Sequence, residues 1–182
     1  MTRNLRITFA AVLMLGVAPL AHAENPMVGG AAMYPTKTIV ENAVNSKDHT
    51  TLVAAVTAAG LVDTLSGPGP FTVFAPTNAA FAKLPAGTVD TLVKPENKAT
   101  LTAILTYHVV PGRITAADIA ANAKAHGGTA SYTTVQGGTL TFRKAGAAWM
   151  IMDGKGDSGR ITIANVMQSN GVIHVIDTVM MP

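Results

Sequence analysis

The residues best suited to chemistry in this sequence are His108, His174 and Asp177. Two imidazoles and a carboxylate could hold a metal ion, or could join a serine in a nucleophilic triad. The chain, however, contains no cysteine, no G-x-S-x-G elbow and no H-E-x-x-H helix, which are common motifs of hydrolases and zinc enzymes. We therefore expect no catalytic site, no metal site and no cofactor, and a protein that is not an enzyme.

A second candidate is the glycine-rich stretch from Asp153 to Gly159. Its carboxylates could attract calcium, although the alternating oxygen ligands and the final glutamate of a calcium loop are missing. Lys155-Gly156-Asp157 is similar to a short integrin-recognition tripeptide. Its glycines precede a predicted strand rather than a helix, which does not favour phosphate binding. Because Gly and Asp are common turn residues, we interpret the stretch as a mobile hairpin loop.

The histidines outside these stretches, His49 and His126, are predicted to be solvated. Trp149 and neighbouring methionines such as Met150 and Met152 are expected to fill a core, although methionine is also suited to an adaptable apolar surface.

The stretch from Phe71 to Phe81 organises the surrounding elements. Residues 71–75 are rich in aromatic and β-branched side chains, which favours a buried strand that includes Phe74. Pro76 removes a backbone donor and ends that strand. Thr77 or Asn78 can then cap a short helix, because a short side-chain oxygen satisfies a free N–H of the first turn.

The first 23 residues are typical of a secretory signal peptide. Arg3 and Arg6 form a basic start, residues 7–20 form an apolar run, and Ala21-His22-Ala23 matches the small-x-small pattern of a cleavage site. We expect cleavage near Ala23-Glu24 and a secreted or periplasmic protein. Residues 24–35, rich in Gly, Ala, Met and Pro without a period, are interpreted as a linker or poorly ordered arm.

The composition of the chain excludes several classes of protein. Removing Arg3 and Arg6 from the 13 basic residues leaves 11 against 10 acidic ones, so the predicted mature chain gives no electrostatic reason to bind nucleic acid. The lack of cysteine excludes disulfides. No later apolar run approaches 18 residues, so no membrane span is predicted. We expect a monomer.

The hydrophobic period changes along residues 36–182, which we expect to form one domain. Helical spacing dominates until about Thr129, and strand-like alternation joined by glycine turns follows. This order favours an α+β fold with an antiparallel sheet over alternating βαβ units. Helices are expected over residues 38–44 and 88–93, between a cap at Asp48 and a stop at Gly60, and between a cap at Thr77 or Asn78 and Pro85. Two more are expected: one starts at Pro95 with Leu101, Ile104 and Leu105 on its inward face, and one starts at the Thr115-x-x-Asp118 capping box with Ile119 inward. The strands are expected over residues 71–75, 107–110, 131–135, 139–143, 148–152, 160–164 and 172–179.

Three segments of the sequence resemble the fasciclin-like domain. They are residues 72–81, 105–112 and 170–177, which read TVFAPTNAAF, LTYHVVPG and NGVIHVID in the family's order. The resemblance implies a wedge-like β-sandwich with small helices packed along it, and a role in adhesion or matrix interaction outside the cytoplasm. It further implies a structural motif composed of Phe74, Pro76, Thr77, Asn78, Phe81, Asn170, Gly171 and His174.

The resemblance also places two candidate partner-binding sites. The family's tyrosine-histidine pair falls on Tyr107-His108, beside Val109-Val110, and its aspartate-isoleucine pair falls on Asn165-Val166, where the carboxylate is missing. On a strand, Tyr107 and His108 would point to opposite faces. Either residue could instead serve the fold, with the Tyr107 hydroxyl finding a partner and His108 bonding nearby backbone. His174 is expected to bond loop backbone.

Two hypotheses for the function follow. The first is a non-enzymatic interaction module that binds another protein or a cell-surface or matrix polymer. The alternative is a protein that binds a small molecule or lipid in an apolar pocket between the helices and the sheet.

Overall fold

The computed structural model describes residues 25–182. The predicted signal peptide and its cleavage point lie outside the described residues. Within the described part of the chain, no helix is both long enough and apolar enough to cross a membrane.

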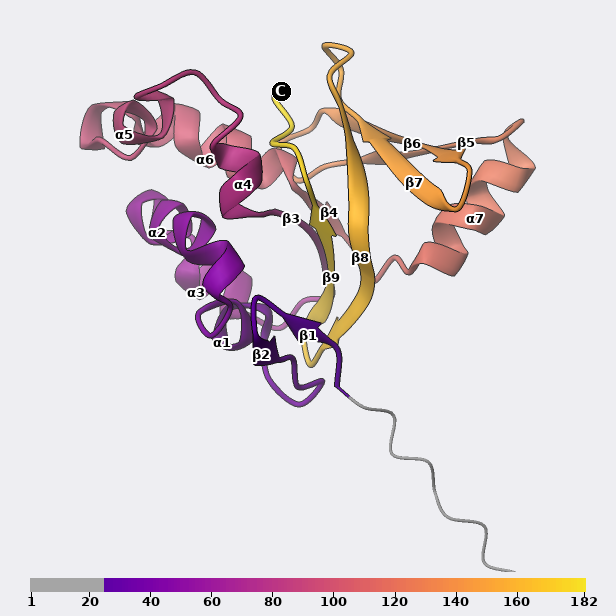
Figure 1. The fold of residues 1–182 in the computed structure, drawn as a ribbon, viewed down its shortest axis with the longest axis horizontal. Coiled ribbons are helices and arrows are strands. Elements are labelled where there is room, and N and C mark those ends of the chain that lie inside the picture. The colour runs from indigo at the N-terminus through magenta and orange to yellow at the C-terminus, as the bar shows by residue number, and fades with distance from the viewer. Residues whose placement is uncertain (1–24) are drawn as a thin grey trace, which may run out of the picture.

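Short helices dominate the first two thirds of the described chain and strands the last third (Figure 1). The helical elements are α1 (Ile39–Ala43), η1 (Lys47–His49), α2 (Thr50–Ala59), α3 (Val62–Ser66), α4 (Asn78–Phe81), α5 (Thr88–Leu92), η2 (Pro95–Asn97), α6 (Lys98–Tyr107) and α7 (Ala116–Ala125). The strands are β1 (Met27–Val28), β2 (Ala31–Ala32), β3 (Phe71–Pro76), β4 (Val109–Pro111), β5 (Thr129–Thr133), β6 (Thr139–Ala145), β7 (Ala148–Met152), β8 (Ser158–Gln168) and β9 (Gly171–Ile176).

The main sheet has seven strands in the order β4-β3-β9-β8-β7-β6-β5. Its pairs are antiparallel except β3 and β9, which run parallel with Phe71 opposite Gly171. The expected α+β class is confirmed, while the expectation of a wholly antiparallel sheet was wrong for this pair. The two edge strands approach each other, since the Val135 N–H after β5 donates to the Val109 carbonyl of β4 at 2.8 Å. The sheet is therefore curled nearly into a barrel.

Each face of the sheet buries a separate hydrophobic core. Helices α1 to α6 cover one face and α7 lies on the other side, as Figure 1 shows. Successive strand residues alternate between the cores: Val73 and Val109 belong to the helical side, and Phe74 and Val110 to the side of α7. This is the alternation that a pleated strand imposes, and burial on both faces explains why β3 and β9 are continuously apolar.

Local signals in the central stretch were read correctly. β3 ends at Pro76, and Thr77 caps α4 by accepting a hydrogen bond from the Ala80 N–H at 3.2 Å. Phe74 is fully buried, and its ring lies 5.0 Å from that of Phe142 between centroids. The stretch is thus part of the core, as predicted.

The segment expected to be a linker or poorly ordered arm contains a short β-hairpin over residues 27–32. β1 and β2 form a hairpin in which Val28 pairs with Ala31. Val28 and Met33 are buried against the helical core, and the Lys47 N–H donates to the Gly29 carbonyl at 3.1 Å. Strands of two residues are too short to show a period in the sequence, so the interpretation of this segment was wrong.

Candidate functional site

Tyr107 and His108 lie at the end of a helix, not on a strand. α6 runs to Tyr107, His108 is its C-cap, and β4 begins only at Val109. The strand predicted over residues 107–110 was therefore two residues too long at its start. The sequence did carry the signal, because Leu101, Ile104, Leu105 and His108 have the i, i+3, i+4, i+7 spacing of one helical face.

The predicted binding residues around this pair have almost no exposed surface. Tyr107, His108, Val109 and Val110 are 1%, 3%, 5% and 2% exposed. A role as contact residues requires exposed side chains, so this conformation does not offer these four to a partner. Their burial follows from the turn between α6 and β4, which lies between the two cores.

The Tyr107 side chain bonds the backbone at the start of β6 and in the loop after β7. Its hydroxyl donates to the Thr139 carbonyl at 2.8 Å and accepts from the Gly154 N–H at 3.0 Å. Burial raises the pKa of Tyr107; the Gly154 hydrogen bond opposes that rise, and the Asp153 charge adds to it. The hydroxyl stays protonated and acts as a structural bridge.

His108 bonds backbone on both of its ring nitrogens. The Met180 N–H can only donate, so Nε2 accepts it at 3.0 Å, and Nδ1 carries the proton that is donated to the Ile104 carbonyl at 2.8 Å. Burial lowers the pKa of His108 to about 4, against opposing contributions from the Ile104 hydrogen bond and the Asp153 charge. The ring is neutral and ties the C-terminal segment to α6.

The Asp153 carboxylate, in the glycine-rich loop, accepts hydrogen bonds from three backbone N–H groups. Its Oδ1 accepts from the Lys155 and Asp157 N–H groups at 3.0 and 2.9 Å, and its Oδ2 accepts from the Met181 N–H at 3.0 Å. The predicted hairpin turn is present between β7 and β8, and residues Lys155, Gly156 and Asp157 are exposed in it. Among residues 25–182, no three His, Asp or Glu side chains are grouped so as to hold a metal ion.

His174 is buried on β9 and also serves backbone. Its Nε2 donates to the Ile114 carbonyl at 2.8 Å, which leaves Nδ1 to accept from the Asn165 N–H at 3.4 Å. Burial lowers the pKa of His174, and the Ile114 hydrogen bond only partly opposes this shift. With His108 and His174 each engaged by backbone, the triad or metal site considered from the sequence does not assemble.

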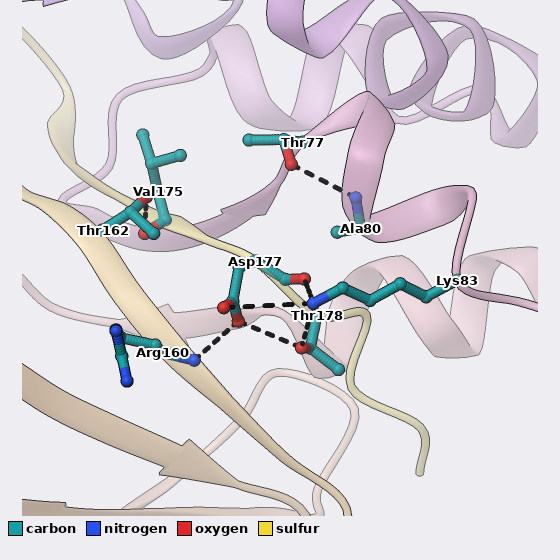
Figure 2. A network of polar contacts seen from close by, with 8 residues as sticks. All are labelled: Thr77, Ala80, Lys83, Arg160, Thr162, Val175, Asp177 and Thr178. Carbon is teal, nitrogen blue, oxygen red and sulfur yellow. Dashed lines mark hydrogen bonds and ion pairs between the residues drawn. The ribbon is translucent and has the colours of Figure 1, made fainter. Parts of the chain in front are cut away.

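Asp177 belongs to a separate, more exposed network (Figure 2). Its Oδ1 accepts from the Arg160 N–H at 2.7 Å and from the Thr178 hydroxyl at 3.0 Å, and its Oδ2 lies 3.9 Å from the Lys83 ammonium. Partial burial acts to raise the pKa of Asp177, but these hydrogen bonds and the Lys83 and Arg160 charges together lower it. The carboxylate thus anchors the end of β9 to β8 and to the turn after α4.

Asn165 lies at an irregularity in β8 and bonds the first turn of α7. Its φ is 60°, and its Oδ1 accepts from the Ala116 N–H, in the first turn of α7, at 2.8 Å. Asparagine adopts this left-handed conformation more readily than most residues. Asn165 is exposed while Val166 is fully buried, so of the six predicted binding residues only Asn165 presents a side chain to solvent.

Asn170 and Gly171 join distant parts of the chain. The Asn170 side chain accepts from the Ile39 N–H at 3.0 Å and donates to the Leu65 and Gly67 carbonyls at 2.8 and 2.9 Å. A Cβ on Gly171 would lie 2.0 Å from the Phe71 carbonyl oxygen. The turn itself was predictable, whereas these long-range bonds were not.

Sequence reasoning missed the burial of His49. It is 3% exposed, with Nδ1 2.8 Å from the Ser46 hydroxyl, so the prediction that it is solvated was wrong; His126 is exposed, as predicted. Burial lowers the pKa of His49, although the Ala75 backbone and the Asp48 charge oppose this shift. No local pattern distinguishes the two histidines, because tertiary packing buries one of them.

An apolar pocket of about 150 Å³ lies between the helices and the sheet. Its walls come from α1, α2, α3 and α6, and β3 and β4 contribute Val73 and Val109. The position matches the alternative hypothesis drawn from the sequence. The full lining comprises Ile39, Val40, Ala43, Val44, Leu52, Val53, Val56, Thr57, Val62, Leu65, Val73, Phe74, Leu105, His108 and Val109.

The structure is thus a nearly closed sheet with helices α1 to α6 on one face and α7 on the other. The family model described as Fasciclin domain matches residues 47–182. The chain belongs to the fasciclin domain family, which confirms the resemblance found in the sequence.

Relatives support the same assignment. Protein sll1483 of Synechocystis is 48% identical over 176 residues, covering 92% of this chain and 89% of the relative. Immunogenic protein MPB70 of Mycobacterium bovis is 36% identical over 191 residues, covering 94% and 90%. Cell surface glycolipoprotein MPB83 of the same species is 37% identical over 169 residues, covering 88% and 68%.

The fold is also that of a solved FAS1 domain pair from the insect cell adhesion molecule fasciclin I. The TM-score is 0.70 at 18% identity, over 80% of this chain. The match spans 51% of the solved chain, about half its length.

Proposed function

We propose that this protein is an exported, monomeric, non-enzymatic interaction module of the adhesion type. It binds another protein or a cell-surface or matrix polymer, in the periplasm or after secretion. The observation that carries the proposal is the match of most of the chain to a fasciclin domain, together with a relative described as a cell surface glycolipoprotein and a fold shared with a cell adhesion molecule. The basic and apolar start of the sequence supports export.

We propose that the contact surface lies around the irregularity in β8. Asn165 is the exposed member of the predicted binding residues, and Thr162 and Ala164 beside it on the same strand are exposed as well. The Asn165 side chain is held by its bond to Ala116. A fixed backbone with exposed side chains can bind a partner without reorganising, which lowers the entropic cost of association.

Cross-linking capture on intact cells tests this proposal. The Ala164→Arg variant places a long charged side chain on the proposed surface and should abolish capture, while Ala58→Arg, at an exposed position on α2 across the molecule, should retain it. Equal capture by both variants would overturn the placement of the surface. A wild-type chain that captures nothing, with adhesion unchanged after gene deletion, would overturn the function itself.

A further inference from the structure

The apolar pocket has both buried and exposed walls. Leu52, Leu65 and Val73 are buried at its walls, whereas Val44 is 55% exposed and Thr57 is also exposed. The pocket is thus open to solvent on one side and closed by the sheet on the other. Interiors normally fill such a volume with side chains, because an unfilled apolar cavity costs stability in proportion to its size.

The polar side chains that line the pocket have no free hydrogen-bond donor. Both ring nitrogens of His108 are bonded to backbone, and the Thr57 hydroxyl donates to the Val53 carbonyl at 2.8 Å. No Lys, Arg, Asp or Glu lines the pocket. A charged ligand would lose its hydration without gaining a counter-ion, so the lining selects a neutral molecule.

The volume sets the size of that molecule. An apolar cavity of about 150 Å³ lined by aliphatic side chains stays dry and accepts benzene, and this pocket has about the same volume. A second space of about 30 Å³ adjoins it, since Ile39, Ala43, Leu52 and Val73 line both.

We propose that this pocket is a binding site for a small, neutral, hydrocarbon-like molecule with a body about as large as one six-membered ring. The site is distinct from the partner surface on β8, and it gives a location and a ligand class to the alternative hypothesis drawn from the sequence. A free molecule fits better than a side chain of a partner protein. Among the described residues, Val44 is the strongly exposed large apolar side chain at the mouth, and one such residue does not make the apolar centre of a protein interface.

A matched pair of probes tests the proposal: benzene, and benzoate as the same ring with a charge. With the mature chain, benzene should raise the melting temperature in a concentration-dependent way and shift the methyl resonances of Leu52, Val73 and Leu105, while benzoate should do neither. No shift with benzene, or equal binding of benzoate, would overturn the proposal.

Two neighbouring positions on α2 provide the variants. Val53→Phe extends a side chain into the pocket and should weaken benzene binding by at least about tenfold, while Ala54→Phe, on the exposed side of the helix, should leave it unchanged. Both variants are first checked for folding by far-UV circular dichroism. If Val53→Phe is misfolded, Val40→Phe on α1 replaces it. The proposal would also be overturned if the wild-type protein did not bind benzene but lost partner capture on Val53→Phe substitution. That result would show that a partner's side chain occupies the pocket.

Discussion

Replacing His108 by alanine separates a structural role from a binding role for the tyrosine-histidine pair. The change removes the acceptor of the buried Met180 N–H. A buried N–H without a partner lowers the free energy of unfolding by about 1 to 3 kcal/mol. The change also leaves a void where the ring packed, beside the apolar pocket, at about 2 to 4 kcal/mol for a large-to-small core change. Because these contributions overlap, we expect the free energy of unfolding to fall by about 3 to 5 kcal/mol.

His126 provides a matched control for this substitution. Its Nδ1 lies 2.8 Å from the carbonyl four residues earlier, as in His108, but its ring is exposed. His126→Ala should therefore change stability by less than about 0.5 kcal/mol. In a thermal melt, His108→Ala should lower the midpoint by roughly 6 to 20 °C, at about 2 to 4 °C per kcal/mol. If His108→Ala melts like the wild type yet loses its partner, the structural reasoning is refuted and the pair is a contact site.

Acidification should destabilise the protein between about pH 6.5 and pH 4. In this range the unfolded chain binds a proton at His108, but the folded protein does not, because its His108 pKa is lowered to about 4. Neutral His108 therefore contributes up to about 3 kcal/mol to the free energy of unfolding above pH 6.5, and this contribution is lost as the pH falls. In urea titrations, the free energy of unfolding of His108→Ala should depend less on pH than that of the wild type. Phe74→Ala should cost about 3 to 5 kcal/mol, since the ring is fully buried against Phe142; an unchanged melting temperature would contradict its place in the core. Gly171→Ala should lower the free energy of unfolding by about 3 kcal/mol, because the new Cβ would lie 2.0 Å from the Phe71 carbonyl oxygen. Gly154→Ala is the control: its Cβ would lie 3.8 Å from its nearest neighbour, so its melting temperature should be nearly unchanged.

Features that depend on a few neighbouring residues were predictable from the sequence. The Thr115-x-x-Asp118 pattern forms the expected capping box at the start of α7, and Gly60 ends α2 in the left-handed conformation. Both features arise within one helical turn, so the residues that determine them are adjacent in the sequence.

The errors concern residues whose environment depends on distant segments. The residues before His49 and His126 are alike, NSKD and NAKA, yet only His49 is covered by the packed helices. Tyr107 continues a helix because α6 packs its apolar face on the core, although its aromatic and β-branched neighbours favour a strand. In both cases tertiary packing outweighed local preference.

The sequence by itself determined the α+β class, the family, and the order of most helices and strands, because periodicity, caps and turns are written in short stretches of chain. Only the tertiary structure decided which polar side chains are free. The Asn170 side chain accepts a hydrogen bond from an N–H 131 residues away, and His108 Nε2 accepts one from the Met180 N–H near the C-terminus. The apolar pocket is formed by helices and strands that are far apart in the sequence. No local pattern records such contacts, since they form only when distant segments are packed together.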